Sequence, residues 1–249
     1  MRKFRNSGRA AHGVPLKSSP GHGRGPCRPT APMPRCPRPF VAGLSHHIIQ
    51  RGNNRSSMFR TPHDYRVFKE LLHEAASGCD VGIHGYVFMT THIHLLATPS
   101  TSSSLPAMMK SVGEKYVKRF NRQYERSGTL WEGRYRGSLV SDDRYWVTCL
   151  RYIELNPVRA GLVPSPDLYA WSSYRAHAFG QGDPLLTAHP LLLALGQNSI
   201  NRQAAWRATC AMGLDDDSLL TIRSAINGCR PLAAGPTTSD VDQPASEPL

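Results

Sequence analysis

The chain has 249 residues and a formal net charge of +12, which allows one sizeable domain with appendages and favours a polyanionic partner, nucleic acid before an acidic membrane surface. No apolar run approaches the roughly 20 residues of a membrane span, and the basic N-terminus lacks the apolar core of a secretory signal, so we expect no membrane partner. The six cysteines are scattered without a C-x-x-C pair, which argues against a zinc ribbon or a disulfide framework and favours a reduced, cytoplasmic protein.

Both ends of the chain are predicted to be disordered. Residues 1–39 are dense in Gly, Pro and Arg, and they carry nine Lys or Arg residues and no Asp or Glu. Residues 233–249 are also poor in large apolar side chains. Neither segment can bury enough apolar surface to offset the entropy of ordering it, so we expect a basic arm over 1–39 and a disordered tail over 233–249.

The predicted elements between these ends begin with a strand over 46–50. A helix follows from Thr61-Pro62, where Thr is a favoured N-cap and Pro a favoured first helical residue. Its apolar residues recur at helical spacing, and Gly78 is a suitable stop. Further along the chain we expect strands over 81–89, 92–97 and 135–140, and helices over 102–124 and 142–154, the last broken at Asn156-Pro157.

This order of strand, helix, strand, strand, helix and strand is the split βαβ, ferredoxin-like pattern. It predicts an α+β domain over residues 40–180, with a four-stranded antiparallel sheet and two helices on one face. Helical stretches at 190–195, 202–212 and 218–227 predict a C-terminal helical extension over 181–232.

His92 and His94 flank one apolar residue in the predicted strand 92–97. Because side chains alternate along a strand, both imidazoles should lie on one face and Ile93 on the other. Two neutral imidazoles side by side can share a divalent cation. The alternative is a pair of ordinary histidines on a solvated sheet face, but unpartnered imidazoles in so apolar a strand would be costly to bury.

Tyr116 lies in the predicted helix 102–124, on the same apolar stripe as Val112 and Phe120. It is either a core tyrosine or an aromatic at the edge of a nucleic-acid groove, where nearby cations would favour its phenolate. The basic residues of this helix are either a solvated face or a surface that follows a DNA backbone: Lys110, Lys115, Lys118, Arg119 and Arg122.

Residues 128–136 mix glycines, aromatics and arginines. Trp131 is suited to stacking on a base, and Arg134 and Arg136 are suited to phosphate contacts. The alternative is a turn and a strand with one core Trp.

Five patches in order resemble the REP-associated tyrosine transposases, domesticated relatives of the single-tyrosine HUH, IS200-like transposases. The patches lie between about residues 38 and 180 and read HHIIQRGNN, YVFMTTHIHLL, KYVKRFNRQYERSGTLWEGRYRGSLV, YIELNPVRAGLV and WSSY. The resemblance implies cleavage and rejoining of single-stranded or hairpin DNA, such as repeated extragenic palindromes, by a monomer or homodimer. It implies Mg²⁺ or Mn²⁺ on His92 and His94, with Tyr116 as the nucleophile of a 5′-phosphotyrosine intermediate.

Two departures from the family pattern matter. Thr90-Thr91 stand where the family has Pro-Asn before its first motif histidine. The resemblance also implies a third metal ligand, an amide on the tyrosine helix, but Phe120 stands four residues after Tyr116, so we assign Asn121 to this role. These departures motivate the alternative of a catalytically inactive module that binds hairpin DNA or RNA.

Overall fold

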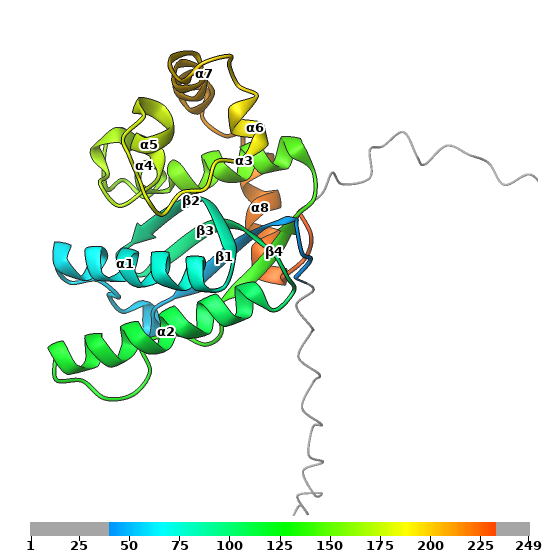
Figure 1. Ribbon diagram of the computed structural model, residues 1–249. Coiled ribbons are helices and arrows are strands. Elements are labelled where there is room, and N and C mark those ends of the chain that lie inside the picture. Colours follow the sequence, from blue (N-terminus) through cyan, green and yellow to red (C-terminus); the bar gives the residue numbers. More distant parts are fainter. Residues whose placement is uncertain (1–39, 233–249) are drawn as a thin grey trace, which may run out of the picture. The chain divides into compact units, whose positions relative to one another are not determined.

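The computed structural model describes residues 40–232, so the predictions of an arm over 1–39 and a tail over 233–249 lie outside the described residues. Four strands form one antiparallel sheet in the order β2-β3-β1-β4 (Figure 1). They are β1 (Ser45–Arg51), β2 (Val81–Met89), β3 (His92–Pro99) and β4 (Arg136–Val140). The α+β class, the four-stranded antiparallel sheet and the split βαβ order of elements are confirmed.

One face of the sheet is covered by α1 (Pro62–Gly78) and α2 (Ser104–Gln123), which pack on each other and on β2 (Figure 1). The start of α1 is secured by Asp64, whose carboxylate accepts hydrogen bonds from the backbone N–H groups of Arg60 and Thr61. The apolar stripes of both helices and the inward-facing residues of the strands, such as Ile93 and Phe88, form one core.

The opposite face of the sheet is covered by α3 (Asp143–Glu154) and α8 (Asp216–Gly228). Asp142 caps α3, since its carboxylate accepts from the backbone N–H groups of Arg144 and Tyr145. A Cβ atom at Gly85 of β2 would collide with Leu150 of α3. The missing side chain at Gly85 therefore lets α3 approach the sheet closely.

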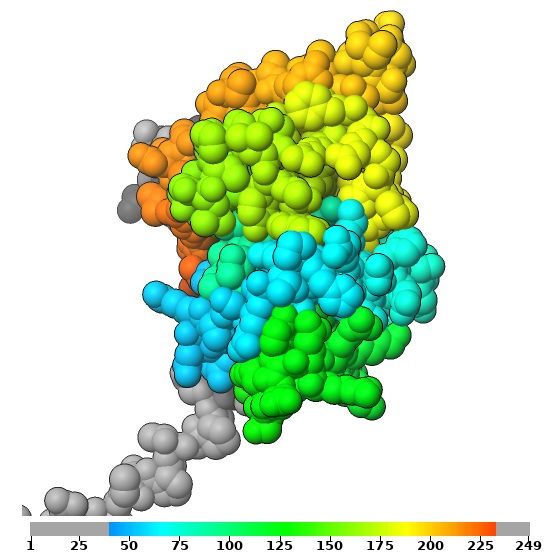
Figure 2. All heavy atoms as spheres, turned by 90° about the vertical axis from the view of Figure 1, so that its left-hand side faces the viewer, coloured from blue at the N-terminus to red at the C-terminus, as the bar shows by residue number. Residues whose placement is uncertain are grey.

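The remaining elements follow α3 in the sequence. They are α4 (Asn156–Arg159), α5 (Tyr174–Phe179), α6 (Pro190–Leu193), α7 (Ser199–Ala211) and two short 3₁₀ turns at Asn53–Arg55 and Pro166–Leu168. Figure 2 shows the yellow-green segment, which includes α3 to α5, between the blue-to-green N-terminal elements and the orange C-terminal helices. The helices expected over 181–232 are present, and α8 returns to β4, β1 and α3, so this segment packs on the sheet.

The free edge of β2 is covered by the segment that leads into α5. The Phe88 N–H donates to the Trp171 carbonyl, and the Ser173 N–H donates to the Tyr86 carbonyl. This pairing protects an edge that would otherwise expose a row of unpaired backbone groups. Over residues 40–232, no helix is long and apolar enough to cross a membrane.

Candidate active site

The histidine pair of β3 lies on the face of the sheet that α3 covers. His94 is buried there, whereas Ile93 lies in the core under α1 and α2. The ring centroids of His92 and His94 are 5.1 Å apart. The predicted alternation of these side chains is therefore confirmed.

A third histidine, His47 of β1, completes this group and was not predicted from the sequence. Its Nε2 forms a 2.8 Å hydrogen bond with Nδ1 of His94, and the two rings stack at 5.0 Å. The signal for it lies in the antiparallel pairing of β1 with β3, which places Ile49 opposite His94 and His47 two residues further along, on the same face. Only the register of the two strands reveals this neighbour.

Burial keeps all three imidazoles neutral near neutral pH. It lowers the pKa of His47 to about 3 and that of His92 to about 4, and it moves the pKa of His94 well below the usual range. Nδ1 of His92 lies 3.1 Å from the Thr91 hydroxyl, and Nδ1 of His94 is taken by His47. The Nε2 atom of each remains as a neutral donor suited to a divalent cation.

The tyrosine beside these histidines is Tyr152 of α3, which was not among the predicted site residues. Its ring centroid lies 5.7 Å from that of His94 and 5.8 Å from that of His47. The Arg159 guanidinium lies over the same ring at 4.2 Å, and its Nη2 donates to the Tyr152 carbonyl at 2.8 Å. A hydroxyl-bearing side chain, two imidazoles and a cation thus meet on one face of the sheet.

Tyr116 lies on the other face of the sheet. It is 1 % exposed in the core under α1 and α2, and its hydroxyl donates a 2.6 Å hydrogen bond to the Met58 carbonyl. Burial raises the pKa of Tyr116 far above its usual value, so the expectation that neighbouring cations favour its phenolate is wrong. The sheet separates Tyr116 from the histidine pair, and the structure does not bring the predicted nucleophile and metal ligands together.

Asn121 is separated from the histidines for the same reason. It lies near the end of α2, where its Nδ2 donates to the Gly128 carbonyl at 2.8 Å. An amide one helical turn after Tyr152 does exist, because the buried Asn156 opens α4 four residues later. Within residues 40–232, no three His, Cys, Asp or Glu side chains gather closely enough to hold a metal ion.

The basic residues predicted on α2 point to solvent on the layer opposite the histidines. Lys115 lies 3.4 Å from Glu74 of α1, and Arg119 is close to His63. The exposed set is Lys110, Lys115, Lys118, Arg119 and Arg122. These side chains form a basic surface of their own and do not line the histidine site.

Arg134 and Arg136 line a pocket next to the histidine pair, whereas the Trp131 ring packs on the other face of the sheet. Both arginines line a pocket at the end of β1, whose other lining residues are Ile49, Gln50, Arg51, Glu132 and Gly133. Arg51 pairs with His92 across the strands, so this pocket adjoins the histidines. Trp131 is partly buried and packs on the Tyr116 side of the sheet, with the ring centroids of the two residues 6.2 Å apart.

Comparison with known proteins gives one family match and two similar solved structures. Residues 40–156 match the family model described as "Transposase IS200 like". The chain is similar to a solved REP-associated tyrosine transposase bound to a REP hairpin, with 16 % identity over 63 % of this chain and 93 % of that one and a TM-score of 0.49. It is also similar to a putative transposase from Deinococcus radiodurans, with 21 % identity over 44 % of this chain and 88 % of that one and a TM-score of 0.35. No curated protein matches the chain. The segment that matches the IS200-like transposase family model, residues 40–156, contains the whole sheet, the histidines and Tyr152.

Proposed function

We propose that the protein is a DNA strand transferase that cleaves and rejoins single-stranded hairpin DNA through a 5′-phosphotyrosine formed on Tyr152. The observation that supports this most directly is the position of Tyr152, whose ring lies beside His94 and His47 and beneath Arg159. Tyr116, which the sequence resemblance indicated as the nucleophile, lacks all of these neighbours.

The proposed step is a transesterification. The Tyr152 oxygen attacks the scissile phosphorus, an O–P bond forms, the bond from phosphorus to the DNA 3′ oxygen breaks, and the phenolic proton ends on that oxygen through solvent. Arg159 lies where its guanidinium can pair with the phosphate oxygens as charge develops on them. Since one phosphodiester replaces another, attack by the 3′ hydroxyl on the phosphotyrosine reverses the step without an outside energy source.

The donor set suits a divalent cation. His92 and His94 offer neutral ring nitrogens, and we assign the side-chain amide of Asn156 in place of Asn121 as the third ligand, since it stands one turn after Tyr152. Bound there, Mg²⁺ or Mn²⁺ would polarise the scissile phosphate and stabilise the departing 3′ oxygen. The resemblance implies an amide on the tyrosine helix, but Phe120, which cannot bind a metal, stands four residues after Tyr116. With Tyr152 as the nucleophile, the residue four positions later is Asn156, which carries the required amide.

Two basic surfaces are available for the DNA. Arg51, Arg134 and Arg136 flank the histidines and would hold the phosphates next to the scissile bond. The exposed basic residues of α2 lie on the other layer and would contact a more distant part of a folded hairpin. The choice of a hairpin, such as a repeated extragenic palindrome, rests on the sequence resemblance.

The test is direct capture of the intermediate. Purified protein is incubated with Mn²⁺ and single-stranded palindromic oligonucleotides labelled at the 3′ end, and the products are separated on a denaturing gel. We expect a protein band that carries label and disappears with EDTA. Tight binding of every hairpin without any labelled protein band would refute strand transfer.

A binding module without catalysis is the second candidate. The Thr90-Thr91 turn before His92 and the lack of a third His, Cys, Asp or Glu ligand within residues 40–232 favour it. Titration with Mn²⁺ separates the two candidates. A protein with intact His92 and His94 that binds hairpin DNA but no Mn²⁺ would be a binding module.

His47 should determine how tightly the metal is held. We expect His47→Leu to weaken Mn²⁺ binding about 10- to 100-fold, because Nδ1 of His94 then loses the partner that orients its ring. Isothermal titration of Mn²⁺ measures this loss. His84→Leu is the matched control, since His84 is also a buried histidine of the sheet but bonds to Thr98 and Thr187. Equal Mn²⁺ affinity for the two variants would contradict the role of His47.

A further inference from the structure

Glu154, two residues after Tyr152, is a fully buried carboxylate at the last position of α3. A negative charge in the last turn opposes the helix dipole, and a buried carboxylate is costly unless it is fully hydrogen-bonded. Its presence therefore requires compensation from outside α3.

Three side chains from later in the sequence provide this compensation. Ser173 Oγ donates to Oε1 at 2.5 Å, and His177 Nδ1 lies 2.6 Å from the same oxygen. Trp206 Nε1 donates to Oε2 at 2.8 Å. Ser173 precedes α5, His177 belongs to α5 and Trp206 to α7, so one carboxylate joins α3 to two helices outside residues 40–156.

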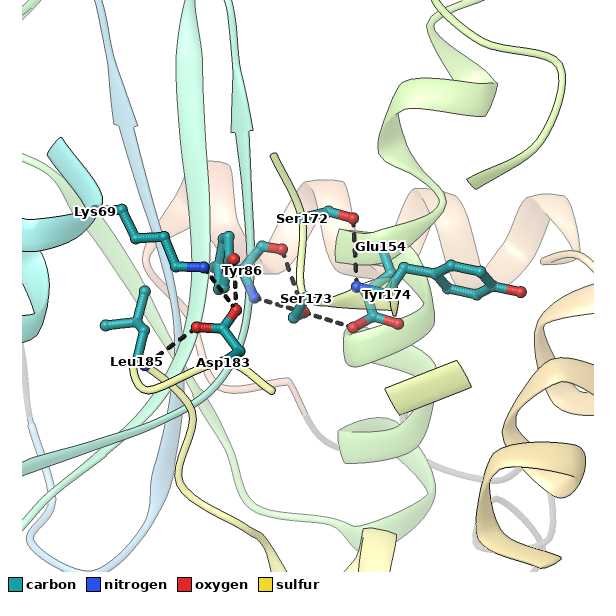
Figure 3. Close-up of polar contacts among 8 residues, drawn as sticks. All are labelled: Lys69, Tyr86, Glu154, Ser172, Ser173, Tyr174, Asp183 and Leu185. Atoms are coloured by element: carbon teal, nitrogen blue, oxygen red, sulfur yellow. Dashed lines mark hydrogen bonds and ion pairs between the residues drawn. The ribbon is translucent and has the colours of Figure 1, made fainter. Parts of the chain in front are cut away.

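The same serine also connects α3 to the edge of the sheet. Figure 3 shows Ser173 between Glu154 and Tyr86 of β2, with a 3.0 Å hydrogen bond from the Tyr86 N–H to Ser173 Oγ. The Tyr86 hydroxyl donates to Asp183 at 2.7 Å, and Asp183 pairs with Lys69 of α1 at 2.9 Å. A continuous set of polar contacts thus extends from α1 across the edge of β2 to α3.

Tyr152 and Glu154 lie on opposite sides of their helix. Two residues correspond to a rotation of about 200° in an α-helix. Tyr152 accordingly faces His47 and His94, while Glu154 faces α5 and α7. The helix is therefore held from behind at the same turn that presents the tyrosine to the histidines.

We propose that Glu154 is a positioning residue for Tyr152, and that α5 and α7 belong to the strand-transfer machinery although they lie outside the matched family segment. The clamp is defined as Glu154 with Ser173, His177 and Trp206. This proposal rests on the proposed function, because the clamp holds Tyr152, which is assigned there as the nucleophile. Such a contact matters to the chemistry because a displacement of about 1 Å in a reacting group can cost about 10²-fold in rate.

Single-turnover kinetics of adduct formation test the clamp. Glu154→Gln keeps the shape of the side chain but turns an NH₂ group toward one of the three donors, so that one hydrogen bond of the clamp is lost. Because Tyr152 is then held less precisely, we expect the adduct rate to fall about 10- to 100-fold. The dissociation constant for hairpin DNA should stay within about twofold, because Glu154 is buried away from the basic surfaces. Trp206→Phe removes one donor and should lower the rate less.

Cys210→Ala is the matched control on α7. Cys210 is buried in the same core as Trp206 but is not a hydrogen-bond partner of Glu154, so its replacement should lower the melting temperature without changing the adduct rate. If Cys210→Ala slows the adduct as much as Glu154→Gln at equal loss of melting temperature, Glu154 is only structural and the proposal is overturned.

Hydrogen exchange separates this proposal from the proposed function. We expect Glu154→Gln to lose amide protection selectively in residues 150–155, while the amides of β1 and β3 keep theirs. A wild-type protein that forms no adduct refutes strand transfer. Unchanged protection of residues 150–155 in Glu154→Gln refutes the clamp, whether or not the adduct forms.

Discussion

Replacement of Tyr152 by Phe is expected to abolish the covalent protein–DNA adduct. Phe keeps the ring that packs against His94 and His47 and removes only the oxygen that would attack phosphorus. Loss of a nucleophile typically costs at least about 10⁴-fold in rate. The measurement is the rate of label transfer to protein under single-turnover conditions, with DNA affinity measured in parallel by gel retardation.

Tyr116→Phe is the paired control for this experiment. It removes the hydrogen bond to the Met58 carbonyl and should cost about 1–2 kcal/mol of stability, while the adduct still forms. DNA affinity should be the same in both variants. Loss of the adduct in Tyr116→Phe together with its retention in Tyr152→Phe would return the nucleophile to α2.

The second large effect is a loss of stability in acid, to which His84 of β2 contributes. Trp146 Nε1 can only donate, and it donates to Ser45 Oγ at 2.9 Å. When His84 is neutral, Thr98 donates to its Nε2 and accepts from Ser45, over two contacts of 2.8 Å. Nδ1–H of His84 completes the chain by donating to the Thr187 carbonyl. With a neutral imidazole, the hydrogen bonds of this chain all run in one consistent direction.

Burial lowers the pKa of His84 to about 4, and the nearby His189 and His177 add repulsion whenever they are charged. The unfolded chain takes up this proton near pH 6.5, whereas the folded chain does so only near pH 4. The stability contributed by neutral His84 is therefore complete above pH 6.5 and is lost as the pH falls. Between pH 7 and pH 5 the free energy of unfolding should drop by about 2 kcal/mol from this group.

Urea unfolding at pH 7, 6 and 5 measures this effect. Glutamine cannot titrate, so between pH 7 and pH 5 the free energy of unfolding of His84→Gln should drop by about 2 kcal/mol less than that of the wild type. The variant is expected to be less stable than the wild type at pH 7. A variant with the same pH dependence as the wild type would show that His84 is not responsible.

Local sequence patterns were sufficient to predict the strands and helices and to place the histidine pair, which is one half of the candidate site. Alternation and helical spacing predicted the four strands and the two covering helices, and Thr61-Pro62 placed the start of α1. His92 and His94 could be assigned to one face because the two-residue period of a strand is a local property. His47 could not be found in this way, since it reaches His94 only through the pairing of β1 with β3.

The position of each tyrosine relative to the histidines needed the tertiary structure. Tyr116 and Tyr152 both lie on apolar stripes of helices, and a stripe indicates that a helix packs but not which face of the sheet it covers. The basic residues of α2 favour a nucleic-acid role for Tyr116, but they face solvent on the layer opposite the histidines. In the sequence, Asn156 before Pro157 indicates only the end of a helix.

The sequence by itself therefore determined the α+β class, the order of elements and the histidine pair, because these depend on periodicity over a few residues. The tertiary structure alone decided that Tyr152, His47 and Arg159 join that pair and that Glu154 is held by α5 and α7. These groups are brought together by strand register and by the packing of helices on opposite faces of one sheet. Such contacts join residues far apart in the chain, where no local pattern records them.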